Sequence, residues 1–93
     1  MSDVIDLSLL KESRALLETT LQRRGLSYFL AKEGPSPLFS IEKEPVDRVV
    51  RAARAKLERA GREAHPRSID YCRKELRREL IRRVTQAMMR VGY

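Results

Sequence analysis

The chain has 93 residues, 35% of them charged, and a formal net charge of +7 at pH 7. This length fits one domain over residues 1–93, and the single cysteine excludes an intrachain disulfide. The first residues lack the basic and apolar regions of a signal peptide, and no apolar run approaches the roughly 20 residues that cross a bilayer. We therefore expect a cytoplasmic protein with no membrane association.

The charge is distributed unevenly along the chain. Residues 1–45 carry six Lys or Arg against seven Asp or Glu, whereas residues 46–93 carry fourteen against six. A nearly neutral N-terminal half is thus followed by a strongly basic C-terminal half. This asymmetry indicates an anionic partner, either nucleic acid or an acidic protein.

The first predicted helix covers residues 7–24, and its leucines fall on two faces. One face carries Leu7, Leu10, Leu17 and Leu21, and the second carries Leu9 and Leu16. Such a wide apolar arc needs cover on two sides. Leu9 and Leu16 are therefore buried either inside the chain or in a homodimer, and the pattern leaves both alternatives open.

Residues 26–43 form the ambiguous segment. The short apolar runs LSYFLA and LFSI flank a Gly-Pro-Ser-Pro turn signal at residues 34–37. This pattern predicts a β-hairpin. The alternative keeps the first run helical and leaves the second as an extended connector, because periodicity does not separate a short buried strand from a buried helical turn.

Two further helices are predicted, over residues 45–61 and 67–91. Apolar residues recur at helical spacing in the first, at Val46, Val49, Val50, Ala53, Leu57 and Ala60. In the second the apolar stripe comprises Ile69, Cys72, Leu76, Leu80, Val84, Ala87 and Val91, widened by Ile81 and Met88. The predicted fold is mainly α, a small three-helix domain with a hairpin or extended connector between helices 1 and 2.

The last helix carries the most concentrated charge. Its segment YCRKELRRELIRRV has six cations and two carboxylates. At 100° per residue one strip turns away from the apolar stripe, and we call it the basic strip: Arg67, Tyr71, Lys74, Arg78 and Arg82. It is either a surface that contacts phosphate or a solvated face that pairs with Asp70, Glu75 and Glu79. Three carboxylates do not neutralise the eight cations of this helix, so five cations remain unpaired and both alternatives stay open.

The second and third helices, joined by a short link, resemble a helix-turn-helix in outline over about 45 residues. The resemblance implies that the start of the last helix contacts duplex DNA, through Arg67, Ser68, Tyr71 and Lys74. Four arginines on the preceding helix and the link would provide a weaker flanking surface: Arg48, Arg51, Arg59 and Arg62.

A cluster of His65, Ser68, Asp70 and Cys72 has the residue types of an enzyme site. Ser68 and Asp70 fit the start of a helix, however, and Cys72 fits the apolar stripe. His65 and Cys72 supply only two of the four ligands of a structural zinc site. We expect no catalysis, metal, cofactor or small-molecule substrate.

These observations lead to two expected functions. The first is a small basic nucleic-acid-binding regulator or accessory protein that contacts duplex phosphate, with DNA favoured, through its C-terminal helices. The alternative is a protein-interaction module, such as an inhibitor or adaptor, that docks its basic face on an acidic protein and seats its first helix in a partner's groove.

Overall fold

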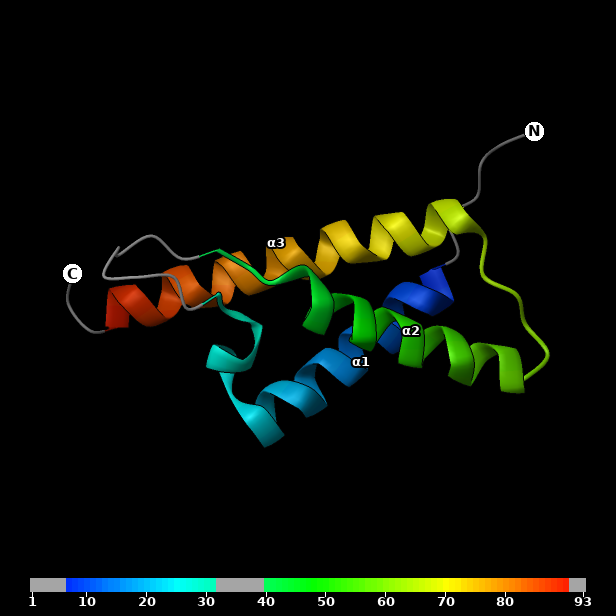
Figure 1. Ribbon diagram of the computed structural model, residues 1–93, viewed down its shortest axis with the longest axis horizontal. Helices are drawn as coiled ribbons and strands as arrows, with labels where there is room; N and C mark the ends of the chain where they lie inside the picture. Colours follow the sequence, from blue (N-terminus) through cyan, green and yellow to red (C-terminus); the bar gives the residue numbers. More distant parts are fainter. Residues whose placement is uncertain (1–6, 32–39, 91–93) are drawn as a thin grey trace.

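A computed structural model describes residues 7–31 and 40–90 of the chain. Within these residues the fold is mainly helical, as expected (Figure 1). The helices are α1 (Leu7–Arg24), the short 3-10 helix η1 (Leu26–Phe29), α2 (Lys43–Arg59) and α3 (Pro66–Arg90). The observed bounds of α1 coincide with the predicted range 7–24. Within the same residues, no helix combines the length and apolar composition needed to cross a membrane.

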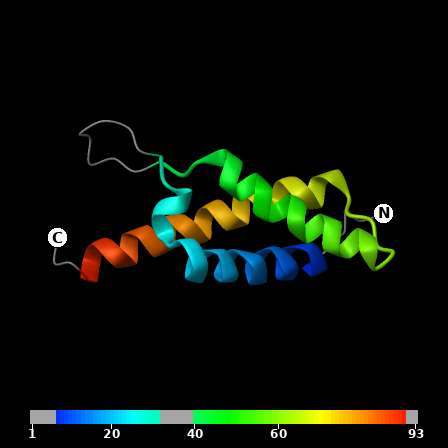
Figure 2. The ribbon, with the colours of Figure 1, turned by 60° about the horizontal axis from the view of Figure 1, so that its bottom comes forward.

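The three α-helices pack as an up-down-up bundle. Arg14 lies 3.8 Å from Glu75, and Glu18 forms an ion pair with Arg83, so the two pairs advance together along α1 and α3. These two helices are therefore parallel. α2 runs in the opposite direction, which Figures 1 and 2 show from two sides.

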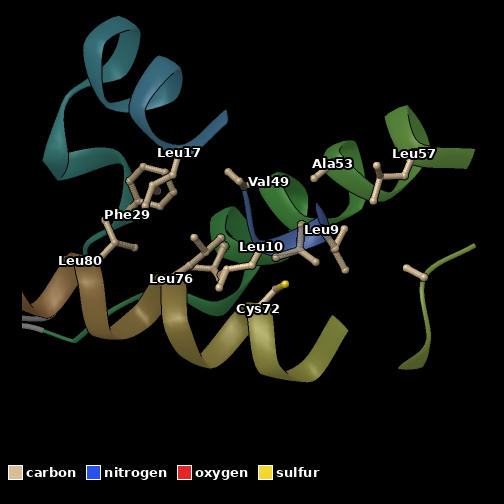
Figure 3. Packing of buried hydrophobic residues seen from close by; sticks show 13 residues of the cluster. Leu9, Leu10, Leu17, Phe29, Val49, Ala53, Leu57, Cys72, Leu76 and Leu80 are labelled. Atoms are coloured by element: carbon tan, nitrogen blue, oxygen red, sulfur yellow. The ribbon is translucent and has the colours of Figure 1, made fainter. Parts of the chain in front are cut away.

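One apolar core holds the three helices and η1 together. Figure 3 shows the ring of Phe29, from η1, between Leu17 of α1 and Leu80 of α3. The core cluster comprises Leu9, Leu10, Leu17, Phe29, Val46, Val49, Val50, Ala53, Leu57, Ala64, Cys72, Leu76 and Leu80. α1 thus packs against both α2 and α3 through this core.

A homodimer contact was one of two alternatives for Leu9 and Leu16, and the two leucines differ in burial. Leu9 has no exposed surface, and Leu16 is half-buried against the same core. Intrachain burial therefore accounts for Leu9, which belongs to the core that α1 forms with α2 and α3. Homodimerisation stays a prediction, but Leu9 does not supply a surface for it.

The predicted β-hairpin over residues 26–43 is not supported, since the described residues contain no strand. The first apolar run forms η1, and then Leu30 and Ile41 meet in an isolated antiparallel bridge. Two backbone hydrogen bonds flank the bridge: Ala31 N–H donates to Ser40 at 2.9 Å, and Glu42 N–H donates to Phe29 at 2.8 Å. The first run thus follows the helical alternative, and its helical turn places Phe29 in the core. The turn signal at residues 34–37 lies outside the described residues.

α2 begins and ends two residues earlier than the predicted range 45–61. It begins at Lys43, and Pro45 is tolerated in its first turn because N–H groups there have no helical partner. Beyond Arg59, the N–H of Gly61 donates to Glu58 at 2.9 Å and the next N–H donates to Leu57 at 2.9 Å. These are the two bonds of a Schellman motif, which explains why Gly61, at φ 79°, closes the helix.

The Gly61→Ala variant is expected to lose about 1–2 kcal/mol of unfolding free energy, because a side chain disfavours the left-handed backbone. No atom lies within 4 Å of the position that a Cβ would take, so the loss comes from the backbone alone. Thermal unfolding measures it as a fall in Tm of about 4–8 °C per kcal/mol. Gly61→Asn should lose less, and an unchanged Tm in Gly61→Ala would contradict the assignment.

α3 starts with a cap different from the predicted one. The His65 Nδ1 accepts the N–H of Arg67 at 3.1 Å, and the His65 carbonyl accepts the N–H of Ser68 at 2.9 Å. Pro66 then occupies the first helical position, where its missing N–H costs nothing. Ser68 is inside the helix and buried, so the cap is His65 and not Ser68.

Candidate nucleic-acid interface

The basic strip lies on the solvent side of α3. Arg67, Lys74, Arg78 and Arg82 are exposed, and the side chains of Arg78 and Arg82 retain 75% and 67% of their accessible surface. Tyr71 is half-buried and packs against the core. The strip thus presents four cations to solvent and the rim of one aromatic ring.

Two glutamates of α3 are each engaged by an arginine of the strip. Arg78 lies 3.3 Å from Glu75, which also lies 3.8 Å from Arg14 of α1. Arg82 lies 3.3 Å from Glu79. These i,i+3 pairs were expected from the spacing. Exposed pairs of this kind contribute little stability, so the two arginines can turn to another anion at small cost.

The aspartate near the start of α3 does not pair with the strip. Asp70 contacts Arg73 at 3.1 Å, and the same guanidinium contacts Asp47 of α2 at 2.9 Å. The expected contact between Asp70 and Lys74 is absent, and neither Lys74 nor Arg77 forms an ion pair within the described residues. Excess positive charge therefore remains along the exposed side of α3.

A groove of about 320 Å³ lies between α2 and α3, next to the exposed side of α3. Its lining comprises Lys43, Val46, Asp47, Asp70, Arg73, Lys74 and Arg77. The bridge from Arg73 to Asp47 crosses the groove and joins the two helices. Lys74 and Arg77 also line the groove, and both are exposed to a ligand that binds α3.

The four flanking arginines follow the solvent side of α2 and the link after it. Arg48 pairs with Glu44 at 2.8 Å, and hydrogen bonds to Glu44 and then Tyr28 raise the pKa of Arg48 above its ordinary value. Arg51 is exposed, and the Asp47 carboxylate one turn before it contacts Arg73 of α3. Within the described residues, α2 thus carries a basic surface of its own beside the one on α3.

The remaining flanking arginines lie at the far end of α2. The Nε of Arg59 donates to the backbone carbonyl of Ala55 at 3.4 Å. Arg62 lines a cleft of about 540 Å³ together with the carboxylates of Glu58 and Glu63. Those carboxylates offset part of its charge, so this end of the α2 surface is a weaker site for phosphate.

A third cationic cluster could not be recognised from the sequence. A cleft of about 850 Å³ lies where α1 ends and α2 begins, and its lining comprises Arg23, Arg24, Ser27, Tyr28, Leu30, Glu42, Glu44, Pro45 and Arg48. The guanidinium of Arg24 lies 5.0 Å from the ring centroid of Tyr28. Three cations and two carboxylates leave it less basic than α3. Its arginines come from segments that only the tertiary fold brings together.

The cluster noted as enzyme-like is dispersed by the fold. His65 caps α3, Asp70 pairs with Arg73 at the surface, and Cys72 is buried in the core. Among the described residues, no group of three or more His, Cys, Asp or Glu could hold a metal ion. Absence of catalysis stays a prediction. Comparison of the chain with protein-family models, with curated proteins and with solved structures found no match.

Proposed function

We propose that this protein is a small nucleic-acid-binding regulator or accessory factor that contacts duplex DNA through the basic strip of α3. Arg67, Lys74, Arg78 and Arg82 would contact backbone phosphates, and Tyr71 would make a positioning contact. Binding would release the counterions condensed on DNA, which gives affinity without sequence reading. The α2 surface would add weaker contacts through Arg48, Arg51, Arg59 and Arg62.

The observation that supports this proposal most strongly is the unneutralised charge on the exposed side of α3. The helix carries eight cations and three carboxylates, and each of these carboxylates already contacts at least one arginine. The strip extends over the sixteen residues from Arg67 to Arg82, and the two ends lie about 22 Å apart at a rise of 1.5 Å per residue. That length corresponds to about six or seven base pairs at 3.4 Å each.

Duplex DNA fits the strip better than duplex RNA. The major groove of B-DNA is about 12 Å wide and admits an α-helix, whereas the A-form major groove is too narrow for side chains to read. The helix-turn-helix outline adds little, because α2 and α3 run in opposite directions in both views whereas that motif crosses at about 90–120° (Figures 1 and 2). The proposal therefore rests on charge and exposure.

An NMR titration tests the location of the interface. A ¹⁵N-labelled sample would be titrated with a DNA duplex of about 16 base pairs at about 50 mM salt. We expect the largest shifts at residues 67–82 and small ones at the start of α1. No shift, or the largest shifts on α1, would contradict the proposal.

The Glu75→Gln/Glu79→Gln double variant is expected to bind duplex DNA about tenfold more tightly than the wild type. It removes two negative charges and releases Arg78 and Arg82 from their ion pairs. Fluorescence anisotropy at about 50 mM salt measures the affinity. Glu12→Gln/Glu18→Gln adds the same net charge on α1, outside the basic strip and the α2 surface, and should change affinity much less. Equal gains in both variants would show that net charge alone matters.

The alternative function, a protein-interaction module, has one structural observation in its favour. Ile81 and Met88 of α3 are substantially exposed although both belong to the predicted apolar stripe. The expected docking of α1 in a partner's groove finds no such support, since Leu9 and Leu17 are buried inside the chain. A protein partner would therefore use α3, at its C-terminal end.

A further inference from the structure

The C-terminal end of α3 exposes large apolar side chains. Ile81 is 51% exposed, Met88 41% and Met89 70%. In Figures 1 and 2 this end of α3, drawn in red, extends past α1, η1 and α2. Exposed apolar side chains gathered on one surface indicate an interaction site.

The exposure follows from how α3 crosses the bundle. Its buried side chains recur every fourth residue from Cys72 through Leu76 and Leu80 to Val84. Met88 is the next member of this series, but it is exposed. The apolar stripe of α3 is therefore buried as far as Val84 and exposed at Met88, about one helical turn later.

Ile81 and Met88 are exposed, and together with the buried Val84 beside them they form a narrow seam. Ile81, Val84 and Met88 are spaced three and four residues apart, which aligns them along one side of the helix. This is the spacing with which one helix packs along another. Arg78 and Arg82 lie about 60–100° around the helix from Ile81, and Arg77 lies about 40° to its other side. Cations therefore interrupt the apolar face that would have to enter the acyl region of a bilayer.

The charge around the seam selects the kind of partner. Residues 77–90 contain five arginines and one carboxylate: Arg77, Arg78, Arg82, Arg83, Arg90 and Glu79. Glu79 lies 3.3 Å from Arg82 and 3.5 Å from Arg83, so it is already engaged. A second copy of this surface would place arginines against arginines, whereas carboxylates beside an apolar stripe would complement it.

We propose that the C-terminal end of α3, residues 77–90, docks an acidic amphipathic helix of a partner protein. The partner's apolar side chains would cover Ile81 and Met88, and its flanking carboxylates would pair with Arg77 and Arg82. This goes beyond DNA contact, since it assigns a second ligand class to α3. The seam residues themselves are not part of the basic strip.

Designed peptides test the proposal. Three labelled helical peptides of about 18 residues would share one leucine seam and differ only in flanking residues, which are Glu, Gln or Lys. Fluorescence anisotropy would measure their binding to the full chain. We expect the Glu peptide to bind with a Kd of about 10–100 µM, the Gln peptide about tenfold more weakly, and the Lys peptide not detectably.

Variants locate the binding. Ile81→Ser/Met88→Ser should weaken the Glu peptide at least about tenfold, because it removes both exposed apolar contacts. Leu7→Ser removes an equally exposed apolar side chain at the opposite end of the bundle and should leave binding unchanged. Both variants keep every cation of the basic strip. A loss of peptide binding in the seam variant is therefore distinct from a loss of DNA binding.

Several results would overturn the proposal. They are no binding of the Glu peptide below about 1 mM, equal binding of the Glu and Lys peptides, and equal losses in both variants. Self-association of the wild type that the seam variant abolishes, seen by sedimentation equilibrium, would instead assign the seam to a second copy. Binding to phosphatidylglycerol vesicles that the seam variant loses would assign it to a membrane.

Discussion

The Phe29→Ala variant is expected to lose about 3–5 kcal/mol of unfolding free energy. Phe29 is fully buried between Leu17 of α1 and Leu80 of α3, where it joins η1 to both helices (Figure 3). Its ring also meets that of Tyr28 edge to face, with the centroids 5.2 Å apart. Truncation removes this burial and leaves a cavity that the bundle refills only in part.

Urea denaturation followed by circular dichroism measures this loss. Domains are stable by about 0.05–0.15 kcal/mol per residue, so the variant should lose a large share of its total stability. Leu7→Ala removes an exposed side chain of similar kind and should change stability by less than about 0.5 kcal/mol. Similar losses in both variants would show that Phe29 is not a core residue.

The Arg67→Ala/Lys74→Ala/Arg78→Ala/Arg82→Ala variant is expected to bind duplex DNA at least about 100-fold more weakly than the wild type at about 50 mM salt. All four side chains are exposed, so their loss should leave the core intact. Each lost phosphate contact removes one term of counterion release, and the losses accumulate. Fluorescence anisotropy with a labelled random duplex measures the affinity.

A matched variant separates the strip from net charge. It replaces four exposed cations on α1 and the adjoining side of α2: Lys11, Arg14, Arg23 and Lys56. Both variants lose the same charge, but only one loses the proposed contacts. The matched variant should retain most of the affinity. Equal losses would mean that the attraction is diffuse and that no interface lies on α3.

Helix periodicity predicted much of the fold. Residues 7–24 form a helix with the predicted bounds, and the predicted stripes of the other helices are buried from Val46 to Leu57 and from Cys72 to Val84. Periodicity succeeds here because each buried stripe repeats for about three turns or more. It fails at Ala60, Ile81, Ala87 and Met88, which are exposed, since burial depends on how far the neighbouring helices extend. Val91 lies outside the described residues.

The segment after α1 could not be decided from its own residues. LSYF and LFSI have the composition of strands, but Phe29 is drawn into the core and the first run closes into η1. A single bridge, between Leu30 and Ile41, is the pairing observed in the described residues. The secondary structure of a short apolar run depends more on its tertiary packing than on its intrinsic propensity.

The candidate interface was partly predictable for a related reason. All members of the basic strip belong to one helix, so a helical wheel placed Arg67, Lys74, Arg78 and Arg82 together. Contacts between helices were not predictable. The bridge from Arg73 to Asp47 needs the packed arrangement of α2 and α3.

The salt dependence of duplex binding tests the central claim most directly. Anisotropy would be measured at several salt concentrations for the wild type, the basic-strip variant and the matched variant. The account predicts a log–log slope of about −4 to −6 for the wild type, and a slope flatter by about 3 for the strip variant alone. No binding at about 50 mM salt, or the same slope for the wild type and the strip variant, would contradict phosphate contact by α3.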